Sequence, residues 1–185
     1  MAGQATRVLV ITVSDGVAAG GRADESGSAV ASRLEGLEGL GALGASVDRA
    51  VVPDELEAIA GTIRSAARTH QLVVTTGGTG LTPRDVTPQA VRSILDYEIP
   101  GIGEAMRAAG RAATPLADLS RSLGGVVGRA LVICLPGSPR GALESLDAIE
   151  PILAHALETL AGPHDHGRPA NRQVAYDRGV EEDSD

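Results

Sequence analysis

The stretch from Leu72 to Pro88, LVVTTGGTGLTPRDVTP, leads an apolar strand through a cluster of glycines toward a helix. Its first five residues are apolar or β-branched, which is typical of a strand buried in a sheet. At its far end, Thr87 is a candidate N-cap, and Pro88 suits the first position of a helix. A strand that reaches a helix through glycines predicts an α/β fold, and the backbone N–H groups of such a loop can bind an anion.

The glycines have a second interpretation, because they would equally suit a tight connection that only needs positive φ angles. Their neighbours favour a binding site. Threonine hydroxyls accompany the glycines, and the opposite charges of Arg84 and Asp85 follow in the same short segment. Asp85 could still be a loop carboxylate that accepts hydrogen bonds from nearby backbone.

The rest of the chain also alternates between strand and helix patterns. Apolar runs predict further strands at Val8–Ser14, Ser46–Val52 and Ala130–Leu135. Helical spacing and capping residues predict helices that start near Ser26, Asp54, Pro88, Pro100 and Pro139. This alternation predicts an open α/β fold with a mostly parallel sheet and helices on both faces.

We expect one domain over residues 7–162, preceded by a flexible N-terminus at 1–6 and followed by a disordered acidic tail at 163–185. Two places within the domain are ambiguous. The turn-rich segment 113–128 could hold a short hairpin, and Pro151 either kinks the last helix or starts another one. The first long helix should end or fray from about Gly39, because glycines gather there.

The absence of lysine removes several chemistries from consideration. Without lysine the 185-residue chain cannot form a P-loop of the GxxxxGK[ST] type or a Schiff base with a carbonyl group. A net charge of −8 argues against nucleic acid as a partner, and an anionic substrate would need local positive charge or a metal. With one cysteine, Cys134, and no long apolar run, we expect a cytoplasmic protein without a membrane partner.

Several glycine, hydroxyl and aspartate residues follow the predicted strands directly. Three such loops contain Ser14-Asp15-Gly16, Thr76–Arg84 and Pro136–Pro139, and Asp54 follows a fourth strand. Ligands of open α/β sheets bind outside the carboxyl ends of the strands, at the switch in strand order. The sequence therefore predicts a binding site at this edge.

Most candidate residues also have a purely structural interpretation. Asp54 could simply cap a helix with Glu57 three residues later, and Asp15 could be a turn residue. Ser138 could cap a helix, bind an anion or do both, and Glu104 could interact with a helix dipole or with a ligand. If two carboxylates lie near bound phosphate, they could hold Mg²⁺. For three other features we expect no functional role: Cys134 as a buried side chain, His155 on a helix, and the His164-Asp165-His166 tract.

Four motifs in order, TTGGTGLTPRDVTPQA, PGIGEAMR, LSRSLGG and LPGSPRGALE, resemble the MogA/MoaB molybdopterin-binding proteins, whose eukaryotic relatives are domains of gephyrin and cinnamon. The resemblance covers residues 8–162. It implies a three-layer α/β sandwich, commonly a homotrimer, that acts in molybdenum cofactor synthesis. The sequence departs from the family pattern at Cys134, where Asn is common, and at Ser122-Leu123 within SRSLGG.

In the MogA-type members of this family, the terminal phosphate of molybdopterin attacks the α-phosphorus of Mg-ATP and releases pyrophosphate. The resemblance implies catalytic and Mg²⁺-binding roles, direct or through water, for Asp54 and Asp85. It implies ligand binding by Ser14, Asp15, Thr75, Thr76, Gly77, Gly78, Thr79, Gly80, Glu104, Ser120, Pro136, Gly137, Ser138 and Pro139. A molybdate-insertion protein of the same pathway is an expected partner. Two alternatives are a molybdopterin carrier without catalysis and a nucleotide hydrolase like the CinA proteins.

Overall fold

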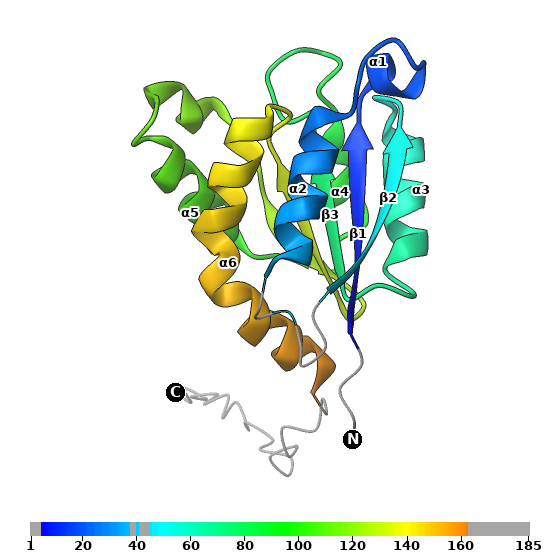
Figure 1. The fold of residues 1–185 in the computed structure, drawn as a ribbon, viewed down its shortest axis with the longest axis vertical. Helices are drawn as coiled ribbons and strands as arrows, with labels where there is room; N and C mark the ends of the chain where they lie inside the picture. The colour runs from blue at the N-terminus through cyan, green and yellow to red at the C-terminus, as the bar shows by residue number, and fades with distance from the viewer. Residues whose placement is uncertain (1–4, 38–39, 41–44, 163–185) are drawn as a thin grey trace, which may run out of the picture.

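The computed structural model describes residues 5–37, 40 and 45–162, and these form a six-stranded sheet covered by helices (Figure 1). In chain order, the strands are β1 (Thr6–Val13), β2 (Ala45–Val52), β3 (Leu72–Thr76), β4 (Tyr97–Glu98), β5 (Gly124–Val127) and β6 (Ala130–Leu135). They lie side by side in the order β2-β1-β3-β6-β5-β4. The pairs β1–β2, β1–β3 and β3–β6 are parallel, whereas β5 pairs antiparallel with β4 and β6.

Helices connect the strands and form the two outer layers. They are α1 (Asp15–Ala18), α2 (Glu25–Glu35), α3 (Leu56–Ala66), α4 (Thr87–Arg92), α5 (Pro100–Gly110), the 3₁₀ helix η1 (Pro115–Leu119) and α6 (Pro139–Ala161). Figure 1 shows α2, α5 and α6 on the near face of the sheet and α3 and α4 behind it. None of the described helices is both long enough and apolar enough to cross a membrane.

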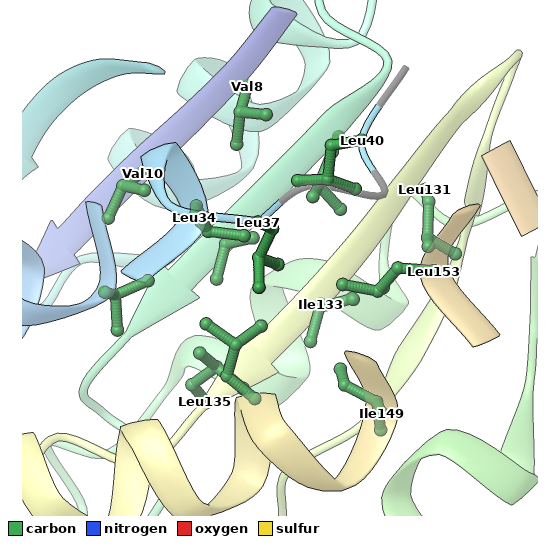
Figure 2. Packing of buried hydrophobic residues seen from close by; sticks show 14 of the residues in the cluster. Val8, Val10, Leu34, Leu37, Leu40, Leu131, Ile133, Leu135, Ile149 and Leu153 are labelled. Carbon is green, nitrogen blue, oxygen red and sulfur yellow. The ribbon is translucent and has the colours of Figure 1, made fainter. Parts of the chain in front are cut away.

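Strand β1 divides the core because its apolar side chains alternate between the two faces of the sheet. Val8 and Val10 join a cluster with α2, α5 and α6, whereas Leu9, Ile11 and Val13 join a second cluster with α3 and α4. The first cluster is drawn in Figure 2, where Leu34 lies close to Val10 and Ile149 lies toward Ile133. A strand buried on both faces needs an unbroken apolar run. This arrangement confirms the three-layer α/β sandwich with a mostly parallel sheet.

Several predicted boundaries differ from the observed ones. The first long helix ends at Glu35, before the predicted limit near Gly39, and residues 38–39 and 41–44 lie outside the described residues. Helix α6 runs without interruption through Pro151. In the ambiguous segment, η1 is followed by β5, which forms a hairpin with β6 through Gly128 at a φ of 61°. The predicted termini, 1–6 and 163–185, fall largely or wholly outside the described residues.

The burial of one face of α6 predicts that two substitutions on this helix differ in their effect on stability. Leu146 of α6 has no exposed surface, so Leu146→Ala should lower the free energy of unfolding by about 2–5 kcal/mol through lost burial and a cavity. Ile152 lies on the same helix with 47% of its surface exposed, and Ile152→Ala should cost about 0.5 kcal/mol. Urea denaturation measures both values. Equal losses for the two variants would contradict the assignment of the buried face of α6.

Candidate functional site

The four parallel strands end at the same edge of the sheet, as the sequence predicts. In Figure 1 the arrowheads of β1, β2 and β3 point toward α1 and the loop that follows β3. A cavity of about 480 Å³ opens at this edge. Residues that line it are Thr12, Val13, Ser14, Val17, Arg22, Ala23, Asp24, Glu25, Ser26, Asp54, Thr76, Gly77, Gly78, Gly137, Ser138 and Pro139.

Two glycines after β3 line this cavity. Gly77 has a φ of 106° and Gly78 a φ of 63°, which are left-handed values that favour glycine. A Cβ atom on Gly77 would lie 2.3 Å from the carbonyl oxygen of Val13, and one on Gly137 would lie 3.1 Å from the Cα of Gly77. The ends of β1, β3 and β6 therefore meet backbone against backbone, with no space for a side chain at Gly77.

The N-termini of two helices face the same cavity. Ser138 caps α6, and its hydroxyl oxygen accepts a hydrogen bond from the Gly141 N–H at 3.2 Å. Asp24 caps α2, and its carboxylate accepts from the Gly27 N–H at 2.9 Å. Because a helix N-terminus carries partial positive charge, and because glycine-loop backbone lies between the two, this cavity suits an anionic ligand.

Asp54 and Asp15 tie the loop after β2 to the loop after β1 through reciprocal hydrogen bonds. The Asp15 N–H donates to the Asp54 carboxylate at 2.9 Å, and the Asp54 N–H donates to the Asp15 carboxylate at 3.0 Å. The hydrogen bond from the Asp54 backbone, followed by the Arg84 guanidinium, lowers the pKa of Asp15. The predicted N-cap role of Asp54 is wrong: Glu55 occupies the N-cap position of α3 and forms no side-chain cap.

Asp85 orders the far part of the glycine loop. Its carboxylate accepts from the Thr82 N–H at 2.8 Å and from the Thr82 hydroxyl at 2.6 Å. Burial raises the pKa of Asp85, but the hydrogen bonds from Thr82 and Gly80 outweigh that effect, so its pKa lies below the ordinary value. Arg121 supports the same loop by donating to the carbonyl oxygens of Gly80, at 2.7 Å, and Asp85.

The predicted binding residues separate into those that line the cavity and those that do not. Ser14, Asp54, Thr76, Gly77, Gly78, Gly137, Ser138 and Pro139 line it, and the Thr76 hydroxyl donates to the Pro136 carbonyl at 2.7 Å. Asp15, Thr79, Gly80 and Asp85 lie beside it in the supporting loops and are not among its lining residues.

Other predicted residues lie in the sheet or at neighbouring cavities. Thr75 is fully buried in β3 beside Cys134, and burial raises the pKa of the Cys134 thiol to about 12. Thr87, the predicted N-cap of the helix after the glycine loop, is instead its first residue, after Val86. Pro136 and Ser120 line a cavity of about 220 Å³ that also reaches Ser138, and Glu104 lines one of about 290 Å³ near Ser120.

Sequence reasoning missed the residues between α1 and α2. Asp24 accepts from the Thr12 hydroxyl at 2.8 Å and pairs with Arg49, and Arg22 donates to the Ser14 hydroxyl oxygen at 3.2 Å. One local signal could have found Asp24: it stands three residues before Gly27, the usual spacing between an N-cap acceptor and its donor. For Arg22 the sequence gives no such signal, because the fold of the loop brings it to the cavity.

The donor set around the cavity suits a magnesium ion that is held mainly by phosphate. One Asp54 carboxylate oxygen accepts from Asp15, and the other lies 3.3 Å from the position of a Cβ on Gly78. Within the described part of the chain, no three His, Cys, Asp or Glu residues gather as a potential metal cage. Mg²⁺ commonly takes one or two carboxylates together with substrate phosphates and water, and Asp54 fits that pattern.

Sequence comparison matches residues 9–155 to the family model of a probable molybdopterin binding domain. The chain is 42% identical over 160 residues to a molybdenum cofactor biosynthesis bifunctional protein of Synechococcus elongatus, covering 85% of this chain and 48% of that protein. It is 37% identical over 114 residues to a molybdopterin adenylyltransferase of Helicobacter pylori, covering 60% and 65% of the two chains. It spans about half the length of the bifunctional relatives and 22% of the gephyrin of Dictyostelium discoideum.

Structure comparison finds the same fold in solved proteins. The molybdopterin biosynthesis enzyme MoaB of Thermus thermophilus superimposes with a TM-score of 0.77 at 44% identity, covering 85% of this chain and 98% of that one. The Mog protein of Mycobacterium ulcerans superimposes with a TM-score of 0.76 at 34% identity, covering 84% and 99%.

The close approach of strand ends predicts different effects for two glycine substitutions. Gly128 has a positive φ but open space around it, so Gly128→Ala should cost only conformational strain of about 1–2 kcal/mol. Gly77→Ala combines strain with a collision against the Val13 carbonyl and should cost about 1–3 kcal/mol more. Urea denaturation compares the variants. If Gly77→Ala is no more destabilised than Gly128→Ala, the backbone packing described above is incorrect.

The hydrogen bonds to Asp85 predict a pH-dependent contribution to stability. Because its pKa is lowered on folding, the ionised form stabilises the folded chain above the unfolded-state pKa of about 3.9, and this contribution disappears as the pH falls through the lower folded-state pKa. Because solvent screens this partly exposed carboxylate, Asp85→Asn should cost only about 0.5 kcal/mol at pH 7 and progressively less below about pH 4. Thermal unfolding at several pH values measures this, with Glu57→Gln on exposed α3 surface as control. A loss that is constant from pH 7 to pH 3 would refute the assignment.

Proposed function

The chain belongs to the MogA/MoaB family of molybdopterin-binding proteins of molybdenum cofactor biosynthesis, and from this premise we propose that it adenylylates molybdopterin. The observation that carries the proposal is the polar cavity, in which the glycine loop, two helix N-termini and the Asp54 carboxylate converge. Relatives described as molybdopterin adenylyltransferases, at 37–39% identity over part of this chain, support the same reaction.

The proposed reaction joins two anionic substrates. An oxygen of the terminal phosphate of molybdopterin forms a bond to the α-phosphorus of ATP, and the bond from that phosphorus to the bridging oxygen of pyrophosphate breaks. Adenylylated molybdopterin and pyrophosphate are the products. The attacking phosphate is already ionised at neutral pH, so the site needs no general base. Its task is to position two phosphates and to offset their repulsion.

The chain's own groups provide that positioning at the cavity. The N-terminal turn of α6 behind Ser138, together with the backbone of Gly77 and Gly78, would hold phosphate oxygens. Asp15 and Arg84 keep Asp54 in place through the hydrogen bonds and the ion pair between the loops. A preorganised arrangement of this kind can stabilise charge in a transition state without reorganising during the reaction.

Asp54 is the residue that would hold Mg²⁺ together with substrate phosphates, and Asp85 would contribute through water. When bound, the ion supplies positive charge that offsets the charge on the phosphoryl groups. Asp85 also keeps the glycine loop in its observed conformation through its hydrogen bonds to Thr82. The lack of lysine is consistent with a site built from a metal ion, backbone and arginine.

A non-catalytic carrier of molybdopterin is the second candidate function. One observation favours it: only Asp54 of the two predicted catalytic carboxylates lines the cavity. A carrier would need the phosphate-binding backbone but not the second carboxylate.

We further propose that the protein is a homotrimer and passes its product to a molybdate-insertion protein. Apolar side chains on η1 support a role in assembly, since Leu116 and Leu119 are 68% and 52% exposed. Both leucines lie on the same short helix, so contact with another subunit could bury them together.

Incubation of the protein with molybdopterin, ATP and Mg²⁺ tests the function, with adenylylated pterin and pyrophosphate as the measured products. The wild type should form both in equal amounts. Asp54→Asn keeps an oxygen that can accept from the Asp15 N–H but loses the negative charge, so turnover should fall about 100-fold or more. Asp85→Asn should also lose transfer while it retains pterin binding.

Asp147→Asn is the matched control, because it removes a carboxylate on α6, in an exposed ion pair with Arg33, that lines neither this cavity nor the neighbouring ones. It should leave turnover unchanged. Tight pterin binding without product in the wild type would decide for the carrier. Normal turnover in Asp54→Asn would refute its proposed role.

A further inference from the structure

Arginine is the only strongly basic side chain available to this site, because the sequence contains no lysine. Three other arginines around the site already have partners. Arg84 pairs with Asp15, and Arg49 pairs with Asp24. Arg121 donates to backbone carbonyls of the glycine loop. These three guanidinium groups are therefore occupied in holding the walls of the site together.

Arg22, in the loop between α1 and α2, differs from them. One of its Nη atoms donates to the Ser14 hydroxyl oxygen at 3.2 Å, and among the described residues it forms no ion pair with a carboxylate. A guanidinium has five N–H donors, so most of those of Arg22 remain available. Ser14 accepts from Arg22 and, at 3.4 Å, from the Val17 N–H, which leaves its own hydroxyl hydrogen to be donated.

The carboxylates in the cavity wall give this arginine a role in binding an anionic ligand. Asp24, Glu25 and Asp54 line the cavity, and Arg22 is the one basic residue among its lining residues. A phosphate that approached the carboxylates without a cation would be repelled. A guanidinium can bind two phosphate oxygens at once, and it gives both charge and direction.

We infer that Arg22 and the Ser14 hydroxyl form a phosphate-binding pair at the α1–α2 end of the cavity. This inference rests on the proposed function, because it assigns part of that site. The phosphate has two possible sources, the polyphosphate chain of the nucleotide and the terminal phosphate of the pterin. Both present the same oxygens to the guanidinium, so binding measurements with each ligand distinguish them.

Isothermal titration calorimetry of the full chain with pyrophosphate, Mg-ATP and molybdopterin tests the inference. Arg22→Gln should weaken the binding of at least one of these ligands by about 10- to 100-fold, the usual effect of losing a hydrogen bond to a charged group. Arg22→Lys keeps the charge but loses the planar pair of donors, so it should recover part of the affinity. Weaker binding of pyrophosphate and ATP identifies the nucleotide phosphates, and weaker binding of molybdopterin alone identifies the pterin phosphate.

Arg64→Gln is the matched control, because it makes the same change in net charge at an exposed position of α3 that does not line the cavity. If Arg22→Gln binds all three ligands as tightly as Arg64→Gln does, the inference is overturned. The outcome is separate from that of the proposed function. If binding depends on Arg22 but the wild type forms no adenylylated product, only the proposed function is contradicted. If the wild type turns over normally and Arg22→Gln leaves all affinities unchanged, only the inference is contradicted.

Discussion

The contact between the backbones of three adjacent strand ends is the constraint on which this site depends. Gly77 lies against the Val13 carbonyl, and Gly137 lies against the Cα of Gly77, so the ends of β1, β3 and β6 leave no space for a side chain at Gly77. This closeness places the N-terminus of α6 beside the glycine loop. An anion-binding surface made of backbone needs such proximity, because amide groups cannot reach across a gap as long side chains can.

Most charged side chains around the site have partners, but Asp54 and Arg22 keep hydrogen-bonding capacity free at the cavity. Asp15 is held by Arg84, Asp24 by Arg49, and the Asp85 carboxylate by Thr82. One oxygen of Asp54 is occupied by the Asp15 N–H, whereas its other oxygen lies near Gly78. Arg22 likewise has only Ser14 as a partner. Opposite charges at two places in one polar cavity suit a metal ion and a phosphate, which is the combination that the proposed transfer requires.

The sequence alone predicts the layers and the edge at which the site lies, because unbroken apolar runs such as Ala130–Leu135 identify strands buried on both faces. It predicts the Ser138 cap from local residue types. It does not predict the short antiparallel strands β4 and β5, since Gly124 and Gly125 give no strand pattern and depend on pairing with β6. Nor does the sequence show that Thr75 and Thr76 differ in role. Thr75 lies beside Cys134 within the sheet, whereas Thr76, the last residue of β3, lines the cavity.

The same distinction applies to Asp54, for which the local sequence offers a helix cap as one interpretation. Its actual partner, Asp15, lies 39 positions earlier, and only the parallel pairing of β1 with β2 brings the two together. A crystal structure with AMP, pyrophosphate and Mg²⁺ bound would test the central claim most directly. The account predicts phosphate groups between the N-termini of α2 and α6, in contact with Gly77 and Gly78. Phosphates bound at any other place on the chain, with this cavity filled by water alone, would contradict it.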